Sequence, residues 1–166
     1  MSPTINESAP ARAEGEPVFF EQTWDLSYRH ALGDTVGQFL GALKRKELLG
    51  RRCPECRRVL FPARSFCDRC HVSTGEWVTV QPRGELAMYT VVYEPFPGML
   101  VQPPYVLSYA LLDGADTAVA GYLKGLDLSD PAEVAKTIRT GTPINVLFAE
   151  VPEGKVTDFW FEIREG

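Results

Sequence analysis

The four cysteines of the chain form two CxxC pairs separated by ten residues. Cys53 pairs with Cys56, and Cys67 pairs with Cys70. Two intervening residues allow a tight turn to direct both sulfurs of a pair toward one ion, and Pro54 favours such a turn. The ten-residue connection is long enough to fold back and complete a tetrahedron. The spacing therefore predicts a structural site of four thiolates, with zinc as the ion.

Other uses of these cysteines stay open from the sequence. Tetrahedral iron takes the same ligands. Two disulfides suit small secreted domains, whereas four cysteines in 166 residues are sparse and the N-terminus lacks an export signal. A redox-active CxxC would use only one of the pairs. His71 directly follows Cys70 and could replace it as a ligand, although four thiolates already complete the site.

The composition indicates a globular chain with a short polar tail. The 45% hydrophobic content is enough for a core. No stretch approaches the roughly 20 apolar residues that a membrane span needs. Four thiolates must stay reduced, so we expect a cytoplasmic protein. Residues 1–17 are polar and are expected to be disordered.

Charge is unevenly distributed along the chain. Nine basic and three acidic residues lie between Lys44 and Cys70, whereas the rest carries eight basic and nineteen acidic residues. A zinc centre with four thiolates has a net charge of about −2, so nearby arginines can balance it. They can equally contact an anionic ligand, and the sequence leaves both interpretations open.

A helix is predicted from Asp34 to Leu49, with Asp34 as N-cap and Gly50 as the stop. Apolar residues recur at helical spacing at Val36, Phe39, Leu40, Leu43 and Leu48.

Three glycines, Gly33, Gly37 and Gly41, lie four residues apart along this segment. Each glycine inside a helix costs up to about 1 kcal/mol relative to alanine. Close approach of another backbone would compensate. That backbone belongs either to the rest of this chain or to a partner subunit.

The segment after Gly84 is predicted to be an OB-fold. Strands are expected at 85–93, 105–112, 117–123, 144–151 and 156–163, with a helix opened by Asp130-Pro131. Three strands, a helix and two strands is the order of a five-stranded OB barrel. We expect a mainly β chain with an N-terminal helix. Its regions are an arm and helix (18–50), a zinc ribbon (51–80) and an OB-fold (81–166).

The loop between the first two predicted strands, 94–104, has four prolines and several apolar side chains. OB-folds commonly bind through this loop. Phe96, Met99 and Leu100 are therefore candidates for a partner interface. The alternative is a loop that plugs the barrel mouth. Phe61 and Phe66 are expected to pack over the metal site.

These features together resemble the zinc-ribbon plus OB-fold family numbered thirty-five among the domains of unknown function. The ribbon of that family is rubredoxin-like. The resemblance covers about Phe20 to Ile163 and rests on Phe39–Gly50, the CPEC pair, Phe61–Cys70, Glu76-Trp77, Gly84–Val91 and Pro104–Val106.

The resemblance implies a non-catalytic subunit of a thiolase-superfamily complex acting on acyl-CoA thioesters. It implies a hetero-oligomer with two copies of each subunit, in which the partner binds most of the acyl-CoA. The arm Trp24–Arg29 looks most like members paired with benzoylsuccinyl-CoA thiolases of anaerobic toluene degradation. The family's metal ligands fall on Cys53, Cys56, Cys67 and Cys70, and no catalytic residue carries over.

The residues themselves agree with a chain that has no activity alone. All cysteines are assigned to metal, and His30 and His71 have no evident nucleophile beside them. The charge pattern suggests CoA-phosphate contacts, with candidates Arg51, Arg52, Arg57, Arg58 and Arg64. Nucleic-acid binding is the alternative function, since zinc ribbons and OB-folds both do it, but the acidic barrel argues against it.

Overall fold

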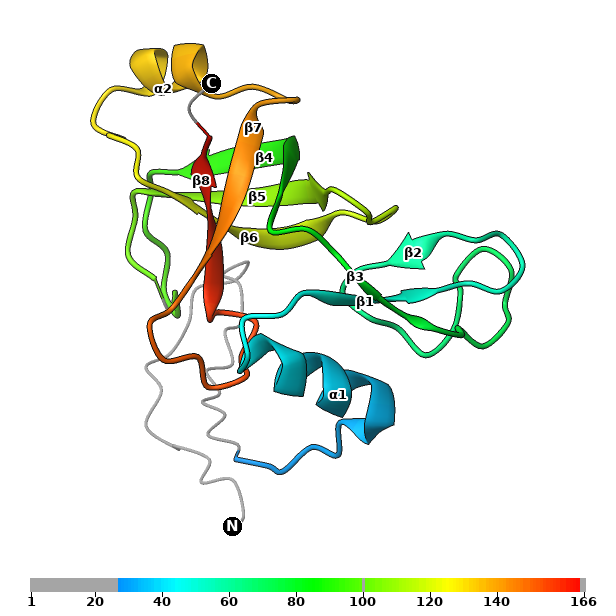
Figure 1. Ribbon diagram of the computed structural model, residues 1–166. Helices are drawn as coiled ribbons and strands as arrows, with labels where there is room; N and C mark the ends of the chain where they lie inside the picture. The colour runs from blue at the N-terminus through cyan, green and yellow to red at the C-terminus, as the bar shows by residue number, and fades with distance from the viewer. Residues whose placement is uncertain (1–26, 100, 165–166) are drawn as a thin grey trace, which may run out of the picture. The chain divides into compact units, whose positions relative to one another are not determined.

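The computed structural model describes residues 27–99 and 101–164 (Figure 1). Contacts divide the chain into two units, Met1–Ala31 and Leu32–Gly166, and all helices and strands described below lie in the second. The predicted tail, most of the predicted arm and the interface candidate Leu100 lie outside the described residues.

Helix α1 spans Gly33–Leu43 and is shorter than predicted. Leu32 occupies the N-cap position without a side-chain cap, so the N-cap prediction for Asp34 is wrong and Asp34 lies in the first turn. The helix ends because the chain turns through Lys46, whose φ is 60°. This turn allows Leu48 to enter the core, where it is buried.

The segment that was predicted to end the helix instead forms the central strand of the ribbon. Strands β1 (Leu49–Arg52), β2 (Val59–Leu60) and β3 (Trp77–Thr79) make an antiparallel sheet in the order β2-β1-β3. Gly50 is therefore a strand residue rather than a helix stop. A Cβ at Gly50 would lie 2.8 Å from Val59 Cγ1, so the position needs glycine for close approach.

A closed barrel follows the ribbon, as the fold-class prediction required. Its strands are β4 (Arg83–Val92), β5 (Tyr105–Leu112), β6 (Val119–Lys124), β7 (Pro143–Phe148) and β8 (Phe159–Ile163). They close in the order β4-β5-β6-β8-β7, and β6 and β8 pair in parallel. Helix α2 (Pro131–Thr137) lies between β6 and β7, with the Asp130 carboxylate accepting a hydrogen bond from the Ala132 N–H at 2.8 Å. The arrangement is that of an OB-fold.

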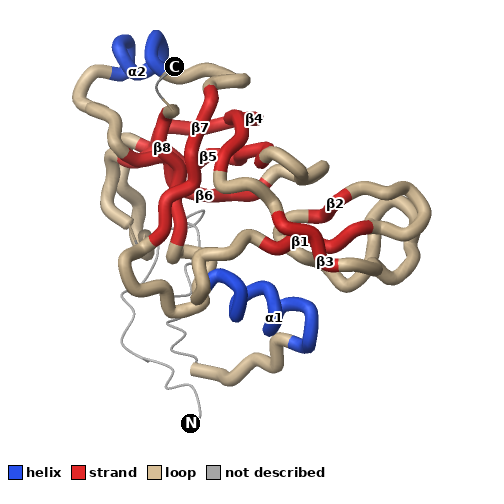
Figure 2. Tube along the Cα trace, in the orientation of Figure 1, coloured by secondary structure: helices blue, strands red, loops and turns tan. Residues whose placement is uncertain are grey.

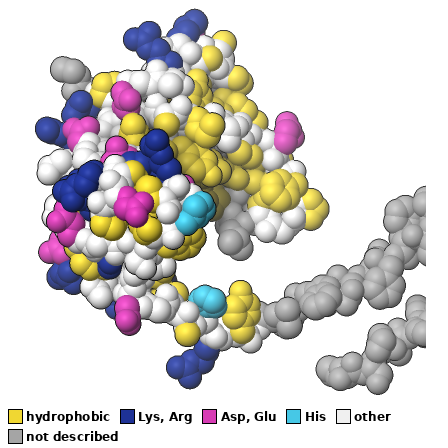
Figure 3. Space-filling model, turned by 90° about the vertical axis from the view of Figure 1, so that its right-hand side faces the viewer, with side chains coloured by type: hydrophobic (Ala, Val, Ile, Leu, Met, Phe, Trp, Pro, Cys, Tyr) yellow, Lys and Arg dark blue, Asp and Glu magenta, His cyan; other side chains and the backbone are white. Residues whose placement is uncertain are grey.

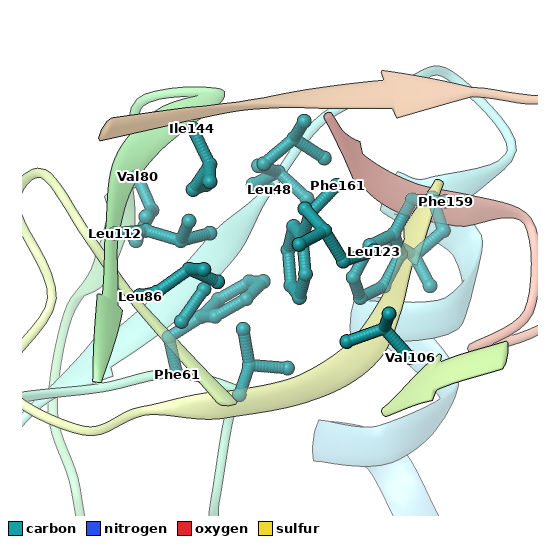
Figure 4. Packing of buried hydrophobic residues seen from close by; sticks show 14 of the residues in the cluster. Leu48, Phe61, Val80, Leu86, Val106, Leu112, Leu123, Ile144, Phe159 and Phe161 are labelled. Atoms are coloured by element: carbon teal, nitrogen blue, oxygen red, sulfur yellow. The ribbon is translucent and has the colours of Figure 1, made fainter. Parts of the chain in front are cut away.

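Helix α1, the ribbon and the barrel contribute to one hydrophobic core. Figure 2 shows α1 beside the β1–β3 sheet. Phe61, directly after β2, is fully buried, and its ring meets Phe39 of α1 edge to face with 5.7 Å between centroids. Figure 4 shows Phe61 next to Leu86 of β4, and Leu48 near Phe161 of β8. The ribbon is thus anchored in the same core as the barrel.

Polar contacts reinforce this attachment at the turn between β5 and β6. The Val59 N–H donates to Asp116 Oδ2 at 2.8 Å, and the Asp116 N–H donates to the Val59 carbonyl at 2.8 Å. The Thr117 hydroxyl accepts from the Phe61 N–H at 2.8 Å and donates to the Phe61 carbonyl at 2.7 Å. Thr117 belongs to this contact rather than to the predicted third strand, so β6 begins two residues later at Val119.

Candidate metal centre

The two CxxC pairs adopt the same backbone turn. In the first, the Arg57 N–H donates to the Cys53 carbonyl at 3.1 Å and the Cys53 N–H donates to the Arg58 carbonyl at 2.8 Å. The second repeats both bonds with His71, Cys67 and Val72, at 2.9 and 2.8 Å. The residue after each pair is left-handed, with φ of 63° at Arg57 and 57° at His71.

These turns bring the four sulfurs together. All four Sγ atoms lie within 4.8 Å of one another, and Cys56 and Cys67 are 3.8 Å apart. A tetrahedron with metal–sulfur bonds of about 2.3 Å has edges of about 3.8 Å, so the cluster has the size of a zinc or iron site. Four soft thiolates leave no position open for substrate, as in structural zinc centres.

Neighbouring thiols raise the pKa of Cys70 to about 12. Hydrogen bonding to Cys56 is the largest cause, followed by burial and by the Cys53 and Cys67 side chains. The Cys70 thiol would therefore not ionise near neutral pH on its own. A bound cation supplies the charge that deprotonates such a cluster.

Two family descriptions match this chain. The description "ChsH2, rubredoxin-like zinc ribbon domain" matches residues 41–74, and "ChsH2, C-terminal OB-fold domain" matches residues 77–149. Together they cover most of the ribbon and the barrel. The chain belongs to the ChsH2/DUF35 family. The predictions of a rubredoxin-like zinc ribbon, an OB-fold and a structural zinc site are confirmed.

One curated relative and two solved structures are similar to this chain. A "DUF35 domain-containing scaffold protein" of Methanocaldococcus jannaschii is 33% identical over 67 residues, which are 40% of this chain and 48% of that relative. The match thus spans about half of the relative's length. A DUF35 protein of unknown function from Sulfolobus solfataricus aligns with a TM-score of 0.58 at 19% identity, covering 80% of this chain and 87% of that one.

The second structure is described as "Ltp2-ChsH2(DUF35) aldolase". It aligns with a TM-score of 0.61 at 22% identity, covering 81% of this chain and 98% of the other. At these identities both structures support the fold alone. Among the described residues of this ChsH2/DUF35 chain, no helix could cross a membrane.

Residues around the metal centre divide between two environments. Leu60 is buried with Cys53 and Cys67, whereas Phe61 faces the large core and Phe66 is 55% exposed. The expectation that Phe61 covers the metal is therefore wrong, because it follows Leu60 and neighbours along a strand point to opposite faces. The same expectation for Phe66 stays a prediction. His71 is not part of the sulfur cluster in the described chain. His71 instead follows the second pair with a left-handed backbone. The sequence pattern did not indicate this conformation.

Most of the candidate arginines have partners inside this ChsH2/DUF35 chain. Arg51 lies over the Trp77 ring, with 4.8 Å from Cζ to the centroid, and donates to the Thr74 carbonyl at 2.6 Å. Arg52 forms an ion pair with Glu76. Arg58 and Arg64 both form ion pairs with Asp68, at 3.5 Å and 3.9 Å.

Arg57 is exposed and lines a hollow of about 220 Å³ together with Arg52 and Glu76. The arginines thus surround the ribbon, and most of their charge is engaged locally. The structure does not bring the five candidates together in one pocket.

The candidate interface residues lie in two separate places. A Cβ added at Gly33, Gly37 or Gly41 would meet nothing within 4 Å among the described residues, so residues 27–99 and 101–164 supply no close neighbour for them. In the loop after β4, Phe96 is 63% exposed and its N–H donates to Met99 Sδ at 3.1 Å. An interface role for both sets stays a prediction.

Proposed function

We propose that this chain is a non-catalytic zinc-binding subunit of an enzyme complex that acts on acyl-CoA thioesters, with a thiolase-superfamily protein as catalytic partner. The observation that carries the proposal is the gathering of all four cysteines at one centre. A thiolase needs a cysteine nucleophile, and this chain has none outside the cluster. The nucleophile must then come from another subunit.

The similar proteins favour a scaffold role for this chain within an enzyme complex. The relative from Methanocaldococcus jannaschii is described as a scaffold protein. One solved structure with this fold is described as an aldolase containing a ChsH2(DUF35) component. A protein that scaffolds an acyl-CoA enzyme would hold its partner rather than carry the reaction. The closed metal centre fits that role, because it stabilises a ribbon too small to fold alone.

The finer form of the proposal names the complex. We expect two copies of each subunit in the cytoplasm, with acyl-CoA bound mainly by the catalytic partner. The resemblance of Trp24–Arg29 to partners of benzoylsuccinyl-CoA thiolases suggests thiolytic cleavage in anaerobic toluene degradation. Native mass spectrometry of the purified complex tests the stoichiometry, and thiolytic activity on benzoylsuccinyl-CoA tests the substrate.

The experiment that tests the proposal is affinity purification of the tagged chain from its native cell, with mass spectrometry and metal analysis of the eluate. We expect one zinc per chain and a thiolase-superfamily protein in equal amount. Recovery of the chain alone, or with nucleic acid that is released by salt, would reject the proposal. The second result would favour the nucleic-acid alternative.

Arg57 tests the prediction of CoA-phosphate contacts with the least damage to the ribbon. Its side chain is exposed, whereas Arg58 pairs with Asp68. Arg57→Glu should raise the KM of the complex for acyl-CoA several-fold and leave kcat unchanged, because a charge contact made equally in the ground and transition states affects binding only. Arg69→Glu, at another exposed ribbon arginine, is the control. Equal KM values for both variants would reject the contact.

A further inference from the structure

An uncharged surface extends across the outer side of β4, β5 and β6. Strand register places outward side chains of the three strands in two rows. The first row is Met88, Tyr109 and Ala120, and the second is Thr90, Leu107 and Tyr122. Charged residues on this side stand only at the ends of the described strands, with Arg83 and Glu85 at one end and Lys124 at the other. We call these two rows the outer sheet face.

The outer sheet face is apolar where a solvated sheet face is ordinarily polar. Met88 is 58% exposed, Tyr109 43% and Leu107 37%. One face of an antiparallel sheet packs on the core, and the opposite face normally alternates to polar side chains. Adjacent exposed apolar residues on a soluble protein mark an interaction site.

A hollow of about 480 Å³ continues from this face at the Tyr122 end. Tyr105 and Tyr122 meet edge to face in its wall, with 5.6 Å between ring centroids, and Val101 and Leu126 also line it. The ammonium of Lys124 lies 4.1 Å from the centroid of the Trp160 ring, so its charge is already engaged. Figure 3, which views the molecule from the ribbon side, shows hydrophobic side chains gathered on the face that it draws.

We infer that the outer sheet face and this hollow form the docking surface for the catalytic partner, which offers an uncharged apolar surface with one large apolar side chain placed in the hollow. The identity of the partner rests on the proposed function. The charge pattern determines the chemistry of the occupant. A charged partner surface would lose its hydration against two rows without a counter-charge, whereas an apolar one gains from burial.

The same surface fits other occupants less well. Nucleic acid needs a basic groove to follow its phosphates. Among the described residues that line the hollow, Lys124 is the one basic side chain, and it stacks on Trp160. A small acyl ligand would fill the hollow but leave both rows of the sheet exposed. A protein covers the rows and the hollow together, with the inserted side chain as its anchor.

Photo-crosslinking in the native cell tests the surface directly. A photoreactive amino acid replaces Leu107 in one tagged chain and Val151, which is 80% exposed in the loop after β7, in another. We expect the first to crosslink to the thiolase-superfamily protein and the second not to. Leu107→Glu and Met88→Glu should each reduce recovery of that protein about tenfold, as expected for residues in an interface centre. Val151→Glu should leave recovery within about twofold. Zinc content and melting temperature check that each variant is folded.

The outcomes separate this inference from the proposed function. If a thiolase-superfamily protein is recovered equally with Leu107→Glu and with Val151→Glu, the docking surface is wrong and the proposed function stands. If no such protein is recovered with the unmodified chain, both fail. Crosslinking at Leu107 only to a second copy of this chain, or to nucleic acid, also overturns the surface. The surface is also wrong if Leu107→Glu abolishes binding of a small acyl-CoA while recovery of the partner stays unchanged.

Discussion

The outer and inner ends of the zinc ribbon differ in what they pack against. At the outer end, three buried residues, Cys53, Leu60 and Cys67, form a small cluster of their own. At the inner end, Val59 and Phe61 belong to the large core that includes the barrel. Adjacent residues of one short strand therefore serve two separate centres, because side chains alternate along a strand.

This difference shows how a small ribbon gains stability at both ends. A cluster of three residues buries too little apolar surface to offset the entropy of ordering the loops around it, so the outer end depends on metal. The inner end depends on apolar burial shared with the barrel. Changes at one end should leave the other largely intact, and three substitutions test this from the largest expected effect to the smallest.

Cys67→Ser removes a buried ligand and should have the largest effect. Zinc content should fall from about one per chain to nearly none, because binding energy of about 10–16 kcal/mol at such sites depends on all four thiolates. The outer end should lose protection from hydrogen exchange while the barrel strands keep theirs. His71→Asn is the control, since asparagine tolerates the left-handed backbone and His71 lies outside the sulfur cluster. Unfolding of the barrel along with the ribbon would contradict the separation.

Phe61→Ala acts at the inner end. Removing a fully buried phenylalanine from a core should lower the free energy of unfolding by about 3–5 kcal/mol, measured by denaturant titration. Zinc content should remain near one per chain, because Leu60 rather than Phe61 packs against the sulfurs. Phe66→Ala, at a side chain that is 55% exposed, should cost less than about 1 kcal/mol. Loss of zinc in Phe61→Ala would show that the two ends are coupled.

Asp116→Ala removes one of the polar contacts between the barrel and β2, the bond from the Val59 N–H to the Asp116 carboxylate. The Val59 N–H would lose its acceptor 2.8 Å away, which should cost about 1–3 kcal/mol of unfolding free energy. Asp113→Ala is the matched control in the same turn. It removes an exposed ion pair with Arg83, worth about 0–1 kcal/mol. Equal losses for the two variants would mean that the contact with β2 adds nothing beyond surface charge.

The metal centre and the barrel could be predicted from sequence because their signals are local. The CxxC spacing fixes which four sulfurs meet. The strand β5 was predicted with the bounds it has, since Pro103-Pro104 and Asp113-Gly114 enclose it. The cap at Asp130 likewise starts α2 where expected. Each of these features depends on residues close together in the chain.

The end of α1 could not be predicted in the same way, because a distant contact decides it. Helical spacing continues through Leu48, but β1 pairs with β2 on one side and β3 on the other. Those pairings place Leu49, the predicted helix end, and Gly50, the predicted stop, in a strand, since long-range sheet contacts override local propensity. The requirement for Gly50 comes from Val59, nine residues away, and is invisible without the sheet register. The partners of the ribbon arginines are hidden for the same reason.

The glycines of α1 offer the smallest expected effect on stability. Gly37→Ala and Gly41→Ala should each raise the free energy of unfolding by up to about 1 kcal/mol, because alanine is the better helix former and its Cβ would meet no described residue within 4 Å. Gly50→Ala is the contrast, since its Cβ would lie 2.8 Å from Val59 Cγ1 and should destabilise the ribbon. If the glycines face a partner, the double variant Gly37→Ala, Gly41→Ala should be more stable alone and yet weaken the complex, with zinc unchanged. Gel filtration measures the second effect. A complex of unaltered mass would show that the glycines of α1 do not contact the partner. The outer sheet face would then be the remaining candidate for the contact.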